Sequence, residues 1–231
     1  MIYKILFKSL GKIIIKIIII LALFLGPIVA LVFKLHYPNF TNSGLLLFIF
    51  LLAIERTWET FYSSRERRGH KLYGDWTLPL VSIAYIILAL IVICEFFLKE
   101  IRIDYRISFV GFFIFISAFI LRIWGMRTLK EQWTVHAIGA QKVKNVFLIK
   151  SGPYKYIRHP IYLGVILEVL SIPLIWNTYF AFIFAVTINV PLQVIRAYFE
   201  EKTSIKKLGK EFISYKKEVP AFLPIKFFRL K

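Results

Sequence analysis

The sequence predicts an all-α integral membrane protein with about six transmembrane helices. Hydrophobic residues make up 58% of the 231 residues, and several apolar runs approach the ~20 residues that cross a bilayer as a helix. Backbone polar groups in lipid must be satisfied within the segment, which excludes open sheets. Because little sequence remains between the runs for a soluble domain, we expect one compact helical unit.

The apolar runs indicate where the helices lie. Lysines recur every four residues from Lys4 to Lys16, share one helix face and lead into the first run. Because no small-x-small cleavage site follows and further runs come later, this segment is interpreted as a span and not as a signal peptide. The predicted spans are residues 17–33, 44–62, 77–98, 107–126, 162–175 and 179–195. The last two are joined by a tight turn at residues 176–178 and are expected to form a C-terminal helical hairpin.

We attribute the net charge of +18 to the basic loops and tails of a membrane protein, and we expect no nucleic-acid partner. The 31 Lys and Arg are spread over both tails and the short loops, as the positive-inside rule describes. Segments 63–76 and 127–158 are rich in cations, whereas 33–44 and 176–178 carry almost none and 99–106 is mixed. We therefore expect a multi-pass protein with both termini in the cytoplasm. It divides into N-terminal transmembrane helices (1–126) and a C-terminal region with the candidate chemistry (127–231).

A polar stripe runs along the last apolar segment. Its members are Asn189, Gln193, Arg196 and Glu200. At about 100° per residue they fall within roughly 60° of one another on a helix. Arg196 and Glu200 could pair with each other as a solvated helix end. Because ionisable groups at membrane depth usually face a cavity or a partner, the deeper Asn189 and Gln193 favour a cavity.

A polar, aromatic and cationic turn occupies residues 152–164, directly before an apolar run. Pro160 suits the first position of a helix, so the N-terminal amides of the helix that begins at His159-Pro160 would face the loop and could bind an anionic group. Lys155 and Arg158 would reinforce that site. Stacking faces for a ring or a cation are offered by Tyr154, Tyr156 and Tyr162. The alternative is an unspecific membrane-interface belt.

Other polar residues leave two interpretations open. Glu55, Arg56 and Glu59 have helical spacing and form either a cavity wall or a charge-paired helix end. Glu168 is either a buried partner for a cation or a helix–helix hydrogen bond. Cys94, inside an apolar run, is expected to pack. No metal site is expected, because His36, His70 and His136 lack neighbouring ligands at metal spacing.

Nucleotide-binding and hydrolase motifs are absent: the chain has no G-x-G-x-x-G, no Walker A loop and no G-x-S-x-G elbow. This excludes a soluble nucleotide-binding fold.

The C-terminal motifs resemble the isoprenylcysteine carboxyl methyltransferase family of membrane enzymes. They are Leu148–Tyr154, Arg158-His159-Pro160-x-Tyr162-x-Gly164, Arg196-x-x-x-Glu200-Glu201, Gly209, Tyr215, Val219-Pro220 and Pro224. The resemblance covers about residues 129–224 and rests on their order and spacing. It implies transfer of a methyl group from S-adenosylmethionine to a carboxylate. The cofactor would occupy a cytoplasmic pocket, and a lipophilic acceptor would enter from the surrounding membrane lipids.

The resemblance also implies site residues. The cofactor contacts fall on Val146, Phe147, Leu148, Ile149, Tyr154, His159, Pro160, Ile161, Tyr162 and Glu200. Arg196 would lie near the acceptor carboxylate and is, with Glu200, the expected catalytic residue. Phe212 departs from the pattern, because the family has a tyrosine at that position.

The residue chemistry agrees with this implied reaction. Methyl transfer from a sulfonium is an in-line displacement that depends on alignment and on removal of water. Three alternatives remain: a phospholipid amine N-methyltransferase, a membrane reductase with a nicotinamide cofactor, and a carrier or scaffold without a cofactor. An arginine suits a carboxylate acceptor better than a neutral amine.

Overall fold

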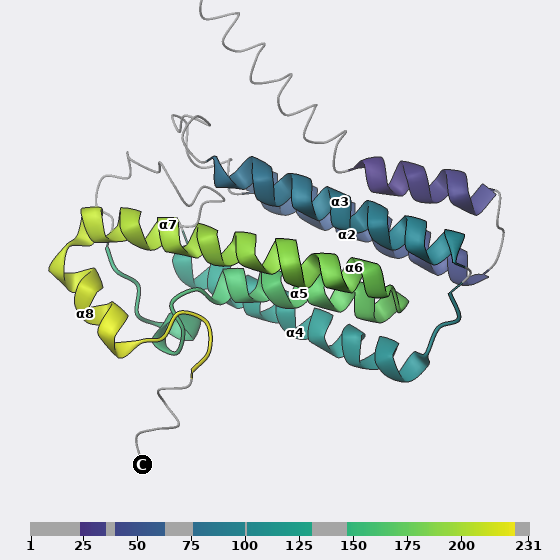
Figure 1. Cartoon of the computed structure of the whole chain (residues 1–231). Helices are drawn as coiled ribbons and strands as arrows, with labels where there is room; N and C mark the ends of the chain where they lie inside the picture. Colours follow the sequence, from purple (N-terminus) through teal and green to yellow (C-terminus); the bar gives the residue numbers. More distant parts are fainter. Residues whose placement is uncertain (1–23, 36–39, 63–75, 100, 131–146, 225–231) are drawn as a thin grey trace, which may run out of the picture.

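The computed structural model describes residues 24–35, 40–62, 76–99, 101–130 and 147–224, and those residues contain helices and no strand. Figure 1 shows the long helices running alongside one another as a bundle. The predicted basic flank, the basic loop at 63–75 and Val146 lie outside the described residues.

The helices follow the predicted apolar runs closely. A helix at Phe24–Leu35 is followed by α2 (Phe40–Tyr62), α3 (Thr77–Leu98), α4 (Tyr105–Leu129), the 3₁₀ turn η2 (Gly152–Lys155), α5 (Pro160–Trp176), α6 (Tyr179–Phe184), the π-helical turn η3 (Ala185–Asn189), α7 (Val190–Leu208) and α8 (Lys210–Glu218). The elements α6, η3 and α7 form one continuous helix, Tyr179–Leu208. At its end α8 folds back (Figure 1) and contacts η2, the turn before α5.

Within the residues that the structure describes, three helices are long and apolar enough to cross a membrane: α3, α4 and Tyr179–Leu208. The helix Phe24–Leu35 and α5 are shorter apolar helices. The all-helical fold and the integral membrane character are therefore confirmed. The six crossings, the helical hairpin and the cytoplasmic pocket stay predictions.

Small residues allow α4 and α5 to pack closely. Gly111, Ala118 and Gly125 are buried and recur every seven residues along α4. A Cβ atom on Gly111 would lie 2.8 Å from the backbone nitrogen of Ile175, and one on Gly125 would lie 2.8 Å from Cγ1 of Ile161. Such residues let two membrane helices approach until their backbones touch. The start of α5 is thereby held against the end of α4.

A turn of two residues connects α5 to α6 and is tied to α4. Asn177 ends α5 in the left-handed conformation, with φ 54°, which asparagine tolerates. Its side-chain amide donates to the Leu174 carbonyl at 2.9 Å and to Ser108 Oγ at 3.1 Å. Its Oδ1 accepts from the Asp104 N–H at 2.6 Å. The turn therefore fixes the spacing between α4 and the α5–α6 connection.

Pro191 explains the π-helical turn. Because proline has no N–H, the usual bond to the carbonyl four residues earlier is lost. The helix widens instead, and the Val190 N–H bonds to the Ala185 carbonyl. Turns of this kind are frequent at functional sites. Asn189, the last residue of this turn, is buried.

Candidate active site

The loop that precedes α5 is shaped by two special residues. Gly152 adopts a positive φ of 57°, and a Cβ atom there would lie 2.6 Å from Thr128 Oγ1, so the loop lies directly against the end of α4. Pro160 occupies the first turn of α5, and His159 is the N-cap residue. His159 is only 5% exposed. The predicted His-Pro turn is therefore a buried helix start.

One carboxylate gathers three parts of the chain around His159. Glu201, from α7, places Oε1 3.0 Å from His159 Nε2. The same oxygen accepts from Arg158 Nε at 2.8 Å, and Oε2 lies 2.6 Å from Lys216 Nζ of α8. Buried carboxylates require such partners. The structure thus assigns Glu201, which the sequence interpretation left without a role, to the centre of this cluster.

The segment after α8 covers the His-Pro turn. The Arg158 N–H donates to the Pro220 carbonyl at 2.9 Å, and the His159 N–H donates to the Ala221 carbonyl at 3.0 Å. The Arg158 guanidinium also donates to the Val219 carbonyl. The Phe222 ring centroid lies 5.7 Å from that of His159. These contacts shield His159 from solvent and place Val219-Pro220 beside the His-Pro turn.

Tyr154 and Tyr215 join η2 to α8. The Tyr215 hydroxyl donates to the Tyr154 carbonyl at 2.6 Å. Burial raises the pKa of Tyr154 well above its ordinary value, and the charge of Glu200 raises it further. Burial also raises the pKa of Tyr215 to about 12. Both phenols are therefore neutral at physiological pH, and Glu200 lies within electrostatic reach of Tyr154.

Arg196 is buried inside the bundle beside this cluster. It is 3% exposed, and its Nε lies 3.4 Å from the Tyr162 hydroxyl. The Tyr162 ring stacks on His159, with centroids 5.5 Å apart and an interplanar angle of 19°. The carboxylate of Glu200 also lies close enough to the Tyr162 hydroxyl to interact with it electrostatically. The Arg196 guanidinium of α7 therefore contacts the Tyr162 phenol, which in turn stacks on the His159 imidazole of the loop.

The structure brings together some of the predicted residues and separates others. Those that meet are Tyr154, His159, Tyr162, Arg196 and Glu200. Ile161 and Pro160 instead contact the α4 face at Gly125. Phe147 is 65% exposed, and Leu148 packs against the cluster of Phe212, Tyr215 and Val219. The deeper stripe residues Asn189 and Gln193 are buried.

A second polar cluster lies within the bundle, apart from the His159 cluster. Glu168 of α5 forms ion pairs with Arg56 of α2 and Arg122 of α4. It also accepts from the Tyr85 hydroxyl of α3 at 2.9 Å. Glu55 lies 2.7 Å from Arg122. Both interpretations of Glu168 are therefore confirmed, because it is a buried partner for cations and also takes part in a helix–helix hydrogen bond. The side chain of Glu59 lies outside the described residues.

The apolar spans and the buried polar cluster at one end of the bundle define a helical integral membrane protein with a candidate enzymatic site. Residues 109–206 match the model of the isoprenylcysteine carboxyl methyltransferase (ICMT) family. This match confirms the resemblance, and His159, Arg196 and Glu201 lie within the matched residues. The family is one of membrane methyltransferases.

A curated relative matches part of the chain. It is the "Uncharacterized protein YpbQ" of Bacillus subtilis (strain 168), which is 35% identical over 89 residues. The match covers 38% of this chain and 51% of the relative, so the chain spans about half the length of the relative it matches.

Proposed function

We propose that this protein transfers the methyl group of S-adenosylmethionine to the carboxylate of a lipophilic acceptor that enters from the bilayer. The observation that carries the proposal is the burial of Arg196 on an apolar helix, beside Tyr162 and inside the segment that matches a methyltransferase family. An arginine at that depth is costly unless it serves a partner or a ligand.

The residues around His159 fit the cofactor. S-adenosylmethionine carries a carboxylate, an ammonium, a sulfonium and an adenine ring. Glu200 supplies negative charge beside Tyr154 and Tyr162, which suits a cationic group near aromatic faces. The helix start at His159-Pro160 favours an anionic group. When bound, the cofactor supplies a methyl group that is electrophilic because it is attached to a positive sulfur.

Arg196 fits the acceptor carboxylate. Its planar guanidinium can bind both oxygens of a carboxylate in a fixed orientation. Because the side chain is buried, those bonds form in a low dielectric and are stronger than in water. A neutral amine would gain nothing from this neighbour, so the carboxylate is favoured over a phospholipid amine.

The other task of the site is to align the acceptor with the methyl group and to exclude water from both. Arg196 orients a carboxylate oxygen towards the methyl group, while Tyr162 fixes Arg196 relative to His159. The segment that follows α8 covers His159. The site would accelerate methyl transfer in two ways, neither of which needs a proton transfer. It would remove water from the acceptor carboxylate and the cofactor sulfonium, and it would hold the carboxylate oxygen close to the methyl group.

Calorimetry tests the cofactor part of the proposal. Detergent-purified protein is titrated with S-adenosylmethionine and with S-adenosylhomocysteine, and the titration is repeated on His159→Ala and Glu200→Ala. Glu211→Ala, on the exposed face of α8, is the matched control. We expect saturable binding that both site variants weaken and the control retains. Binding of a reduced nicotinamide instead would favour the reductase, and absence of any cofactor binding would favour a carrier.

A further inference from the structure

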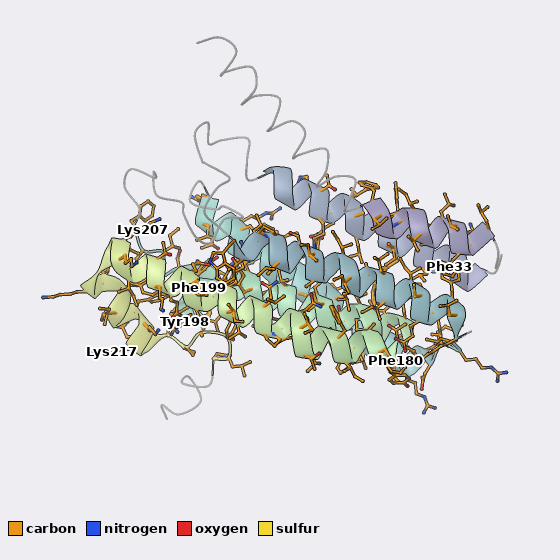
Figure 2. All side chains as sticks on the ribbon, turned by 45° about the horizontal axis from the view of Figure 1, so that its top comes forward. Phe33, Phe180, Tyr198, Phe199, Lys207 and Lys217 are labelled. Carbon is orange, nitrogen blue, oxygen red and sulfur yellow. The ribbon has the colours of Figure 1, made fainter. Side chains whose placement is uncertain are left out.

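We propose that the end of the bundle opposite the candidate active site binds one anionic phospholipid, with its phosphate on Lys99 and Arg102 and an acyl chain along α3. This site is separate from the proposed methyltransferase function and does not depend on it. Figure 2 shows Phe180 at this end, whereas Lys207 and Lys217 lie at the other end, where α7 meets α8.

Two adjoining hollows form the site. A polar hollow of about 340 Å³ lies between the end of α3, residues 101–104 and the start of α6. An apolar hollow of about 310 Å³ runs along α3, with Ile87, Leu90, Ile91, Cys94 and Leu98 in its wall. Both hollows share Glu95, Lys99 and Phe180. A ligand with a charged head and a hydrocarbon chain can therefore occupy both.

The carboxylates of the polar hollow are already used by the protein. Glu95 accepts the N–H groups of Phe180 at 3.1 Å and Ala181 at 3.0 Å, one on each oxygen. Asp104 caps α4 by accepting the Arg106 N–H at 2.9 Å. Each carboxylate therefore neutralises the positive end of a helix and contributes less repulsion to an incoming anion.

Two cations lie at the rim of the polar hollow, where a ligand can reach them. Arg102 is exposed and forms no ion pair or side-chain hydrogen bond with any residue in the described ranges. Lys99 Nζ lies 3.6 Å from the Phe180 ring centroid and 3.7 Å from Glu95 Oε1, and its side chain is half exposed. The neighbouring Glu100 lies outside the described residues. A guanidinium and an ammonium at one rim are suited to a phosphate.

A phospholipid fits better than free phosphate, because only the lipid also fills the apolar hollow. The wall of that hollow is mostly apolar and continues from Lys99 along a helix apolar enough to cross a membrane. Phosphate groups of a bilayer lie at the ends of such helices, where basic residues bind them. The polar hollow therefore lies where a lipid headgroup would be.

Native mass spectrometry of the delipidated, detergent-purified chain tests this site. The probes are phosphatidylglycerol, phosphatidylcholine and glycerol phosphate. We expect one phosphatidylglycerol to bind preferentially, and Lys99→Ala/Arg102→Ala to weaken it about tenfold or more, since charge-assisted hydrogen bonds are lost. Arg106→Ala removes an exposed cation at the same end whose side chain does not line the hollow, and it should bind like the wild type.

Cys94 provides a second readout, because it is the only cysteine of the chain and lines the apolar hollow. Phosphatidylglycerol should slow its alkylation by a bimane reagent in the wild type and in Arg106→Ala, but not in the double variant, and glycerol phosphate should not slow it. The proposal is overturned if the double variant binds phosphatidylglycerol like the wild type. Equal binding of phosphatidylcholine, or an unchanged alkylation rate, would also overturn it.

Discussion

The Nε2 atom of His159 lies 3.0 Å from Oε1 of Glu201, and this contact joins the start of α5 to α7. The adjacent Glu200 interacts electrostatically with the hydroxyl groups of Tyr154 and Tyr162 instead. Successive residues of a helix differ by about 100° in direction, so the two neighbouring carboxylates serve different parts of the same site. Glu201 organises the loop, and Glu200 supplies charge to the proposed cofactor pocket.

Glu201→Ala should weaken cofactor binding through the loop. The change removes the shared partner of Arg158, His159 and Lys216. Loss of such a supporting contact is expected to lower affinity by about 10–100-fold, by analogy with residues that orient metal ligands. Calorimetry with S-adenosylhomocysteine measures the effect, and Glu211→Ala serves as the control. Wild-type affinity in Glu201→Ala would show that the cluster does not position the cofactor.

Glu168→Leu should destabilise the bundle. It removes the buried carboxylate that Arg56 and Arg122 share, so less negative charge balances the two guanidinium groups. Breaking a buried pair by removing one partner costs about 3–5 kcal/mol of the free energy of unfolding. Unfolding in detergent measures the loss, and the double variant Arg122→Leu/Glu168→Leu should recover part of it. A variant as stable as the wild type would contradict the importance of this network.

Gly164→Ala should destabilise the packing of α4 on α5. The added Cβ would lie 2.3 Å from Arg122 Cγ and 3.0 Å from the Ala118 carbonyl oxygen. Overpacking of this kind costs about 1–3 kcal/mol. Gly44→Ala is a matched control, because its nearest neighbour would be Trp176 at 3.6 Å, an ordinary contact. Thermal unfolding should separate the two variants, with Gly44→Ala as stable as the wild type or more stable.

Much of the helical fold could be predicted from apolar runs. The predicted span at residues 77–98 coincides with α3, and the one at 107–126 lies within α4 (Tyr105–Leu129). The last helix extends to Leu208, beyond the predicted 195, because its final turns are amphipathic and carry lysines on the exposed side. Hydropathy alone does not distinguish such an extension from a loop.

The candidate site was predictable in part. The spacing of Asn189, Gln193, Arg196 and Glu200 predicted one polar face. The first three of these side chains are buried, and Glu200 is partly exposed. The role of Glu201 could not be predicted, because its partners come from the loop before α5 and from α8. Helical spacing reports which residues share a face, not which element lies opposite. The lysines of α8 indicate that this helix could supply a cation, but not that Lys216 would pair with Glu201.

Tyr215 should make stability depend on alkaline pH. Its pKa is raised from 10.0 to about 12, so the folded state holds the phenolic proton more tightly than the unfolded state. The stabilisation is present below pH 10 and is lost as the pH rises to about 12. Unfolding of wild type and Tyr215→Phe across this range measures it. The advantage of the wild type should disappear at the alkaline end, and a constant difference would contradict the assignment.

The most direct test of the proposed reaction compares turnover and cofactor binding in Arg196→Ala. Wild type, Arg196→Ala, Arg196→Lys and the exposed control Arg127→Ala receive S-adenosylmethionine and N-acetyl-S-farnesylcysteine as a lipophilic carboxylate. We predict that Arg196→Ala abolishes methyl ester formation while much of the calorimetric affinity for S-adenosylhomocysteine remains, with Arg196→Lys intermediate and the control active. Turnover by Arg196→Ala at the wild-type rate would contradict the proposal that Arg196 orients the acceptor.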